Sequence, residues 1–588
     1  MKQAKTISIG AQYFDRLREK DCFYIDKTDF IRQWWDAEDV VTLITRPRRF
    51  GKTLNMSMLD CFFSTRYQGR GELFEGLSIW REERFRELQG TMPCIFLTFA
   101  GVKLNTLRGA RDGIIDAIEQ AYRVHAYLKD SGVLSAEEKN RFDALSRYLA
   151  NDDPDRKIDD ALVITAIQQL SAWLHAYHQK PVLILLDEYD TPLQEAWIGG
   201  YWQEIVDFIR ALFNNTFKTN RHLARALLTG ITRVSRESIF SDLNNMKVVT
   251  TTSPEYAEAF GFTEEEVFAA MEERGLGGQR DKVKRWYDGF CFGRCRDIYN
   301  PWSITQYLDS GVFDTYWADT SSNSLINSLI RRGSAQIKRD METLLKGEAL
   351  HVSVDEQVVY DQLTENENAL WGLLLAAGYL KVEDRELDEN IGEWIYRLTL
   401  TNQEVEFMFR RMIRRWFGGQ DVPWNDFVQA MISGNLEEMN LYMNRVAQET
   451  FSSFDTGSKP SEVSQPERFY HGFVLGLIAG ETRRYEIRSN RESGYGRYDV
   501  AMIPAASDLP AIVMEFKVHD PAREATLHDT ACAALRQIRD RDYDRDILTR
   551  GVDQGRIRHY GFAFAGKKIL IESDDKKQDG KADEKDKG

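Results

Sequence analysis

The 588-residue sequence lacks the features that would place a chain in or across a membrane. No apolar run approaches the roughly 20 residues that a membrane-spanning helix needs, and the apolar stretch GFVLGLIAG (Gly472–Gly480) is far too short. The first residues also lack the charged-then-apolar order of a secretory signal peptide. We therefore expect a cytoplasmic protein without a membrane partner.

Cysteine is scarce as well, which excludes a disulfide framework. The sequence has six cysteines, and only Cys291 and Cys295 lie close together, with no second pair at zinc-binding spacing. His175 and His178 are similarly isolated from further metal ligands. The cysteines are therefore expected to be reduced thiols that mostly fill the core.

Positive charge is not in excess either. The net charge is −15, so no global basic field attracts nucleic acid or an acidic membrane surface. Any contact with nucleic acid must use a local basic patch. Apolar residues make up 43% and charged residues 29% of the chain, which is ordinary for globular proteins, and the length favours several domains.

The order of strand-like and helix-like segments divides the chain into four parts. In residues 7–245, short apolar runs alternate with longer amphipathic stretches, which predicts an α/β domain with a largely parallel sheet. Helix formers dominate residues 250–457, and this middle region is expected to be mostly helical. A polar linker (454–466) leads into a compact α/β region (458–572). The tail, residues 573–588, is almost entirely Lys, Asp, Glu, Gly and Gln and is expected to be disordered.

A phosphate-binding loop is predicted in the stretch VVTLITRPRRFGKTLNMSMLD (Val40–Asp60), which runs from an apolar strand into a helical pattern. Such a loop needs close backbone approach, a lysine for the outer phosphates and a hydroxyl for the metal. Gly51, Lys52 and Thr53 supply these three features at the required spacing. We expect Thr53 to be a ligand of Mg²⁺.

Arg46 stands where the usual pattern has its first glycine, so the four-residue match FGKT alone is only a moderate signal. Pro47 stiffens the loop by fixing φ. Arg46, Arg48 and Arg49 are expected to add positive charge beside the phosphates. The residues expected to contact the nucleotide are Arg46, Pro47, Arg48, Arg49, Phe50, Gly51, Lys52, Thr53 and Leu54.

A second nucleotide-site signal is the acidic end of the apolar strand PVLILLDEYD. Asp187 is expected to hold Mg²⁺ through water, and Glu188 is placed to orient the attacking water. The alternative is a helix cap after a buried strand, which needs one acidic residue but not an Asp-Glu pair followed by Asp190. Together with the upstream loop, the pair predicts nucleotide hydrolysis.

A further strand, RALLTGITR, ends near Thr229, where a polar group can sense the third phosphate. Arg233 and Arg236 follow at helical spacing in TRVSRESIF. Either could be the arginine that stabilises charge during phosphoryl transfer. The alternative, that each is an ordinary surface arginine, stays open.

The C-terminal region holds a second constellation, in two strands within GRYDVAMIPAASDLPAIVMEFKV. Because strand side chains alternate, Glu515 and Lys517 point the same way, and strand pairing can bring Asp499 to them. Asp499 and Glu515 could hold Mg²⁺ or Mn²⁺, and the metal with Lys517 could activate water against a phosphodiester. The alternative is a hairpin with an ordinary cross-strand ion pair, because this D…ExK pattern recurs widely by chance.

Further residues support the nuclease interpretation. Glu467 follows Pro466, a plausible first helical residue, and could project from a helix start towards the metal. Gln537, on the next helix, could position the strand or the nucleophile. Five arginines form a local basic patch suited to a phosphate backbone: Arg483, Arg484, Arg488, Arg491 and Arg497.

Several long stretches resemble a known bacterial family. YFDRLREKDCFYIDKTDFI, TRPRRFGKT, LLDEYDTPL, LTGITRVSRESIFSDLNN and WYDGFCFG…IYNPWSI are similar to AAA-ATPase-like proteins, which typically carry a C-terminal PD-(D/E)XK nuclease-superfamily domain. FYHGFVLGLIAG, SNRESGYGRYDVAMIP, VMEFKV and ALRQI resemble that domain. The resemblance spans nearly the whole chain, and Arg46 in place of glycine belongs to the family's pattern.

The resemblance implies an ASCE-type P-loop core followed by a restriction-endonuclease-like α/β domain. It implies the ATPase roles given above for Lys52, Thr53, Asp187 and Glu188, with ATP and Mg²⁺ as cofactors. For the nuclease half it implies a metal-dependent core of four residues: Glu467, Asp499, Glu515 and Lys517. It supplies no substrate and no biological role.

The sequence thus favours an ATP-binding and ATP-hydrolysing protein coupled to a Mg²⁺-dependent nuclease-like domain that acts on nucleic acid, with DNA preferred. The first alternative is a nucleotide-dependent switch whose C-terminal domain recognises nucleic acid or a partner without cutting. In a second alternative, ATP is only a structural ligand. Homo-oligomers are compatible with all three, since AAA-like proteins form rings. The aromatics of WYDGFCFG and IYNPWSI are interpreted as core first and as a ligand surface second.

Overall fold

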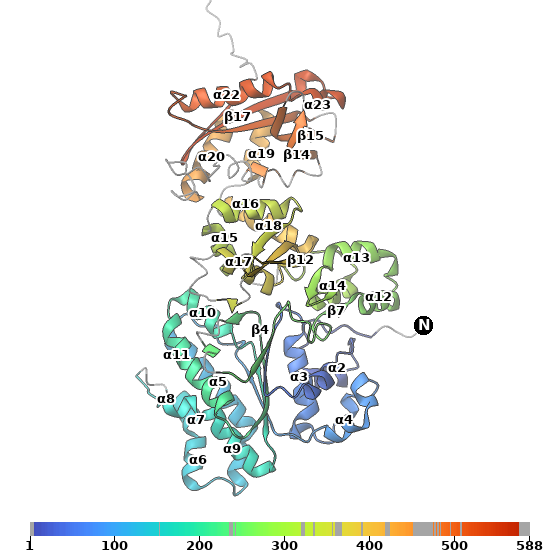
Figure 1. Cartoon of the computed structure of the whole chain (residues 1–588), viewed down its shortest axis with the longest axis vertical. Coiled ribbons are helices and arrows are strands. Elements are labelled where there is room, and N and C mark those ends of the chain that lie inside the picture. The colour runs from blue at the N-terminus through green and yellow to red at the C-terminus, as the bar shows by residue number, and fades with distance from the viewer. Residues whose placement is uncertain are drawn as a thin grey trace, which may run out of the picture. The chain divides into compact units, whose positions relative to one another are not determined.

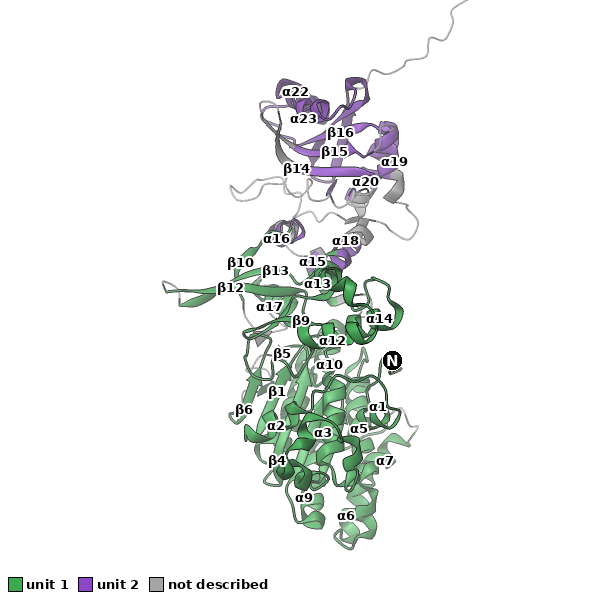
Figure 2. Cartoon of the chain, turned by 90° about the vertical axis from the view of Figure 1, so that its right-hand side faces the viewer, with its two compact units in different colours: residues 1–329, 347–406 green, residues 330–346, 407–588 purple. Residues whose placement is uncertain are grey.

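The computed structural model describes residues 5–574 with several gaps. The gaps are residues 152, 154, 235–238, 241–242, 319–323, 333–334, 355–356, 359–366, 390–391, 418–423, 451–473, 476–477, 479–480, 482–483, 494–495 and 506–508. Arg236, Glu467, the expected linker and the tail beyond residue 574 lie outside the described residues. The chain forms two compact units (Figure 2), the first of residues 1–329 and 347–406 and the second of residues 330–346 and 407–588.

The first unit is built on the parallel five-stranded sheet that the sequence predicts. The strand order is β2-β3-β4-β1-β6, with every pairing parallel. All residues of β1 and β3 are buried, as expected for strands covered on both faces. The carboxyl ends of β1, β4 and β3 are therefore neighbours, and ligands bind at this edge of a parallel sheet. The strands are β1 (Val41–Thr45), β2 (Cys94–Thr98), β3 (Val182–Asp187), β4 (Leu223–Gly230) and β6 (Met246–Val249).

Helices cover both faces of this sheet. Figure 1 shows α5, α9 and α11 on one side and α2, α3 and α4 on the other. The helices are α1 (Phe14–Glu19), α2 (Asp29–Asp36), α3 (Lys52–Phe63), α4 (Glu83–Leu88), α5 (Leu107–Val124), α6 (Ala136–Phe142), α7 (Ala144–Leu149), α8 (Asp160–Ile164), α9 (Ala166–His178), α10 (Thr191–Gly199) and α11 (Trp202–Phe213).

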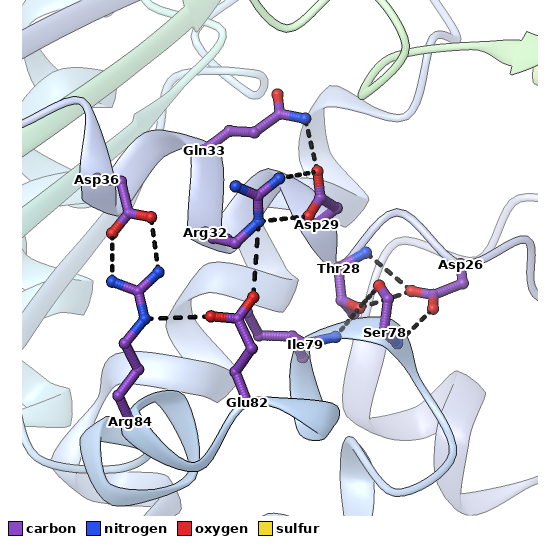
Figure 3. A network of polar contacts seen from close by, with 10 residues as sticks. All are labelled: Asp26, Thr28, Asp29, Arg32, Gln33, Asp36, Ser78, Ile79, Glu82 and Arg84. Carbon is purple, nitrogen blue, oxygen red and sulfur yellow. Dashed lines mark hydrogen bonds and ion pairs between the residues drawn. The ribbon is translucent and has the colours of Figure 1, made fainter.

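A polar network joins the start of α2 to the segment before α4 (Figure 3). Asp26 accepts hydrogen bonds from the backbone N–H of Thr28 (2.9 Å) and of Ser78 (2.6 Å). Arg84 forms two hydrogen bonds with Asp36, at 2.9 and 2.8 Å. The segment just before α2 is thereby fixed in place.

The middle region is mostly helical, as predicted, but it also contains two small antiparallel sheets that the sequence reading missed. Their strand orders are β7-β9-β8 and β10-β13-β12. The strands are β7 (Phe262–Thr263), β8 (Phe290–Phe292), β9 (Cys295–Tyr299), β10 (Leu350–Ser353), β12 (Leu380–Asp388) and β13 (Glu393–Leu400); β5 (Arg233–Val234) and β11 (Gln357–Val358) form a further pair. The helices are α12 (Glu264–Glu273), α13 (Arg280–Tyr287), α14 (Pro301–Ser310), α15 (Ser324–Arg332), α16 (Ala335–Leu345), α17 (Glu367–Ala376) and α18 (Gln403–Phe417).

The second unit is a five-stranded sheet of order β14-β15-β16-β17-β18, in which only β16 and β17 pair in parallel. Helix α22 connects these two strands and packs on one face, and α19 and α20 cover the other (Figure 1). This α/β sheet domain confirms the predicted fold class. The elements are β14 (Tyr485–Ser493), β15 (Gly496–Pro504), β16 (Ala511–Val518), β17 (Ile557–Ala565), β18 (Lys568–Ser573), α19 (Trp424–Ser433), α20 (Leu436–Thr450), α22 (Leu527–Asp540) and α23 (Arg545–Thr549).

His559, on β17, lies between two carboxylates that stabilise its charged form. Its Nε2 is 2.8 Å from Asp544 Oδ1, and its Nδ1 is 2.9 Å from Asp574 Oδ2. Burial lowers the pKa of His559, but the hydrogen bonds to Asp544 and Asp574 outweigh it and raise the pKa to about 9. The protonated histidine therefore stabilises the fold.

We expect this contribution, about 3 kcal/mol, to be present in full below pH 6.5 and lost as the pH rises to about 9. The melting temperature of the parent should therefore fall towards that of His559→Gln over this range, in calorimetry on the full chain. His351→Gln, at an exposed position of β10, is the control and should follow the parent at every pH. A constant gap between parent and His559→Gln up to pH 10 would contradict the prediction.

Candidate functional sites

The predicted phosphate loop joins β1 to α3 through two residues with left-handed backbone. Gly51 has φ 78° and Arg49 has φ 66°. Glycine adopts this conformation freely, whereas it costs another residue roughly 1 kcal/mol. The loop therefore ends at the N-terminus of α3, where backbone N–H groups and the helix dipole favour an anion.

Lys52 is buried inside this loop, with its side chain only 3% exposed. Its Nζ donates hydrogen bonds to the carbonyl oxygens of Arg46 and Pro47, both at 3.1 Å. The same Nζ lies 3.5 Å from Glu188 Oε1. The structure thus places the predicted phosphate-binding lysine beside the carboxylate predicted to orient water.

Asp187, at the end of β3, connects two other predicted residues. Its Oδ2 accepts a hydrogen bond from Thr53 Oγ1 at 2.7 Å, and its Oδ1 accepts one from Thr229 Oγ1 at 2.6 Å. Burial and the neighbouring charge of Glu188 raise the pKa of Asp187 to about 6. Residues from β1–α3, β3 and β4 therefore meet at one carboxylate.

Asp190, just after β3, forms hydrogen bonds with the turn that follows β4. Its Oδ2 accepts hydrogen bonds from the backbone N–H of Ile231 (3.0 Å) and of Thr232 (2.9 Å). A Cβ atom on Gly230 would lie 2.7 Å from Asp190 Oδ1, so the turn has no room for a side chain at this position. Asp190 thus has a structural task beside Glu188, whose own backbone is left-handed with φ 54°.

A cavity of about 480 Å³ opens beside the loop. Residues 48–54 and Glu188 line it, together with Lys103, which follows β2 and which the sequence analysis missed. No motif surrounds Lys103, and only the pairing of β2 with β3 brings it to the site. The cavity therefore holds several positive groups around the predicted phosphate position.

The side chain of Arg46 does not contribute to this charge, which corrects the expectation from the sequence. It is fully buried, donates to the carbonyl oxygens of Thr250 (2.8 Å) and Glu255 (3.2 Å), and lies 4.5 Å from the ring centre of Phe292. Burial lowers its pKa to about 9. A side chain in place of glycine needs space, and here it turns away from the cavity. Pro47 also faces away, because a Cβ on Gly378 would meet its ring at 2.8 Å.

The other nucleotide-site predictions have separate outcomes. Arg233 lies in the short strand β5, paired with Gln357 of β11. Arg236 lies outside the described residues. Arg233 is not one of the described residues that line the cavity, and its role as a charge-stabilising arginine stays a prediction.

Residues of the middle region contact the phosphate loop. The ring of Phe50 contacts that of Phe290 at 4.7 Å between centroids. The carbonyl oxygen of Arg48 accepts hydrogen bonds from Trp317 Nε1 (3.0 Å) and Asn300 Nδ2 (3.4 Å). The WYDGFCFG and IYNPWSI segments thus hold the main chain of the loop.

In the second unit, the structure brings the predicted carboxylates and lysine to one face of β15 and β16. The register pairs Val500 with Met514, so Asp499 comes opposite Glu515. Asp499 Oδ2 accepts a hydrogen bond from the N–H of Phe516 at 2.9 Å. This pairing is the one that the alternation of the two strands predicts.

Gln537 of α22 links this constellation. Its Oε1 accepts a hydrogen bond from Lys517 Nζ at 2.8 Å, and its Nε2 donates to Glu515 Oε1. Nε2 also lies 3.2 Å from the hydroxyl of Tyr543, a residue that the sequence analysis missed. Burial raises the pKa of Tyr543, and the charges of Glu515 and Asp499 raise it further. Because Tyr543 lies beyond the end of α22, no periodic pattern connects it to Gln537.

Comparison with known proteins separates the same two parts of the chain. Residues 8–240 match the family model described as a predicted AAA-ATPase. Residues 465–574 match the PD-(D/E)XK nuclease superfamily model. The chain combines an AAA-ATPase-like domain with a PD-(D/E)XK nuclease-superfamily domain. It is also similar to the "Uncharacterized protein in vnfD 5'region" of Azotobacter chroococcum mcd 1, with 27% identity over 93% of this chain and 94% of that protein.

Domains of these two kinds generally use a nucleotide and a divalent metal ion, and the residues present fit both. In the AAA-ATPase-like domain, the hydroxyl of Thr53 and the carboxylate of Asp187 form an all-oxygen donor pair, which suits Mg²⁺. In the nuclease-superfamily domain, Asp499 and Glu515 supply carboxylates from paired strands. Glu467, the third expected acidic residue, lies outside the described residues.

Two arginines of the expected basic patch are occupied within the nuclease-superfamily domain. Arg488 forms ion pairs with Glu486 (2.7 Å) and Asp546 (2.6 Å). Arg484 pairs with Glu481 at 3.3 Å. The side chains of Arg483, Arg491 and Arg497 lie outside the described residues. The nucleic-acid footprint therefore stays a prediction.

A further acidic cluster, formed by Glu264, Asp288 and Asp297, lies in the middle region. Lys284 Nζ is 2.5, 3.8 and 3.4 Å from the three carboxylates. The lysine already supplies the cation at this place.

Across the described ranges, no helix is both long enough and apolar enough to span a membrane.

Proposed function

We propose that the chain binds and hydrolyses ATP in the AAA-ATPase-like domain, and that this site governs Mg²⁺-dependent cleavage of DNA by the nuclease-superfamily domain. The hydrogen bonds to Asp187 support ATP binding and hydrolysis. The hydroxyls of Thr53 and Thr229 donate to its two carboxylate oxygens, and Lys52 lies close to the neighbouring Glu188. The link that Gln537 makes to both Glu515 and Lys517 supports DNA cleavage.

For ATP hydrolysis, Lys52 would bind the outer phosphates, exchanging its carbonyl contacts for phosphate oxygens. Glu188 would orient the attacking water and accept its proton. Thr53 and Asp187 would hold Mg²⁺, which neutralises charge on the phosphates when bound. Thr229 would keep the Asp187 carboxylate in place through its hydrogen bond. Its role in sensing the third phosphate stays a prediction, because Thr229 is buried and is not one of the described residues that line the cavity.

For nucleic-acid cleavage, Asp499 and Glu515 would hold the metal ion, which supplies a nucleophilic water and a Lewis acid when bound. Lys517 would stabilise negative charge on the scissile phosphate or orient the water. Gln537 acts as a positioning residue, because its amide fixes the distance between the glutamate and the lysine. Tyr543 in turn restrains the amide.

A nucleotide-dependent switch without cleavage is the second candidate. The contacts of Phe50 and Arg48 with residues of the middle region favour it. A conformational change of the loop on nucleotide binding would alter these contacts and so shift Phe290, Asn300 and Trp317. In this case the nuclease-superfamily domain would recognise nucleic acid or another partner without cutting it.

The test is cleavage of plasmid, linear duplex, single-stranded DNA and RNA by the purified full chain with Mg²⁺ or Mn²⁺, with and without ATP. We expect DNA cleavage by the parent, loss of cleavage in Glu515→Ala, and loss of both ATP hydrolysis and its effect on cleavage in Lys52→Ala. Hydrolysis of ATP without cleavage of any substrate would favour the switch. Cleavage unchanged in Glu515→Ala would rule out this metal site.

A further inference from the structure

The cavity of the AAA-ATPase-like domain has a second half that the phosphate-loop motifs leave unassigned. Besides the loop, it is lined by residues 7, 8, 10–12, 23–25 and 27, together with Phe262 and the start of α14. Phe23, Ile25, Phe262 and Trp302 give this half an apolar and aromatic lining, whereas Lys52 and Glu188 make the other half charged. A cavity of this size and lining is typical of small-molecule sites.

Trp302 is an aromatic residue of the cavity lining that contacts the loop. Asn300 caps α14 by accepting hydrogen bonds from the N–H groups of Trp302 (2.9 Å) and Ser303 (3.2 Å). Asn300 also donates to the carbonyl oxygen of Arg48 at 3.4 Å. The guanidinium of Arg49 lies 4.4 Å from the centre of the indole ring. The ring is thus fixed beside the loop and carries a cation–π contact from it.

The N-terminal segment completes the wall around the indole. A Cβ on Gly10, whose φ is 77°, would lie 3.7 Å from Cζ3 of Trp302, so the backbone passes close to the ring. The neighbouring segment that carries Phe23 and Ile25 is fixed by Asp26, which accepts hydrogen bonds from Thr28 N–H and Ser78 N–H (Figure 3). The aromatic half of the cavity is therefore preformed.

We propose that this half binds the base of a purine nucleoside triphosphate, with the base stacked against Trp302 and enclosed by the N-terminal segment. The inference rests on the proposed nucleotide binding at the loop. One end of the cavity is charged and suits phosphates, and the other is flat, apolar and aromatic and suits a base. A purine covers more of an indole than a pyrimidine does. Ser8 and Gln12, which also line the cavity, offer polar groups to the edge of the base.

The test compares binding of ATP with binding of tripolyphosphate, which has no base, by calorimetry on the full chain with Mg²⁺. Trp302→Ala should weaken ATP binding about tenfold or more and leave tripolyphosphate binding unchanged. Trp302→Phe, which keeps a stacking surface, should recover most of the affinity. Lys52→Ala should weaken both ligands, and UTP should bind the parent less tightly than ATP or GTP. Trp394→Ala, at an exposed position of β13, is the matched control and should bind as the parent does.

The outcomes separate this inference from the function on which it rests. If the parent binds neither ATP nor tripolyphosphate, the proposed nucleotide site itself fails. If the parent binds ATP and Trp302→Ala binds it equally well, the stacking proposal is overturned. Equal losses for ATP and tripolyphosphate in Trp302→Ala would also overturn it, because the indole would then act only through the loop. UTP binding as tight as ATP binding would overturn the purine assignment.

Discussion

Glu188→Gln is expected to lower the rate of ATP hydrolysis at least about 100-fold while ATP stays bound. A general base contributes roughly 10²–10⁴ to the rate, and the amide keeps the shape of the side chain but accepts no proton. Binding should persist because the substitution removes a negative charge that lies 3.5 Å from Lys52 and beside the expected triphosphate. The measurement is phosphate release under single-turnover conditions, with retained nucleotide determined in parallel.

The control for this prediction is Glu204→Gln, an exposed position of α11, which should hydrolyse ATP at the parental rate. Parental turnover by Glu188→Gln would show that another group orients the water. Loss of both binding and hydrolysis would instead indicate that Glu188 maintains the loop through Lys52.

Lys517→Met is expected to lower nucleic-acid cleavage about 100-fold or more and to leave ATP hydrolysis unchanged. Methionine keeps much of the length of lysine but cannot stabilise a developing negative charge, an effect worth roughly 10²–10³ in rate. It also removes the donor that holds Gln537 Oε1 at 2.8 Å. Initial cleavage rates and ATP hydrolysis should be measured on the same preparations.

Two further variants show whether a loss of cleavage in Lys517→Met is specific to the nuclease site. Gln537→Leu should show a smaller loss of about tenfold, partly recovered at higher Mn²⁺ concentration, because it loosens Glu515 and Lys517 without removing either. Lys568→Met, at an exposed position of β18, should cleave as the parent does. If Lys517→Met retained full cleavage, the lysine would serve only to hold α22 against the sheet.

The sequence predicts those parts of both sites that depend on strand ends and strand faces. Asp187 follows a buried apolar run, and Glu515 and Lys517 alternate on one strand, so local pattern was enough to find them. Lys103, Trp302 and Tyr543 have no such pattern. They reach their sites through strand order or through distant segments, which a single sequence does not display.

The sequence also did not predict which way the Arg46 side chain points or which sheet helices α19 and α20 pack against. Arg46 occupies a loop position in the sequence, but whether it faces the phosphates or the core depends on space provided by residues 250–292. Helices α19 and α20 show an ordinary amphipathic pattern, which does not say which sheet they cover. In the structure their methionines, Met431 and Met443, share one core with Met502 and Met514 of the C-terminal sheet. The small sheets of the middle region were missed because their strands are short or, as in β12, rich in charge.

The buried Arg46 side chain has a consequence for how such a loop can evolve. Glycine at this position would remove the side chain that donates to the carbonyl oxygens of both Thr250 and Glu255 and would leave a hollow against Phe292. A viable glycine variant would need compensating changes in a segment far away along the chain. The arginine and the residues around it are therefore expected to be inherited together, as a unit that single substitutions do not readily dismantle.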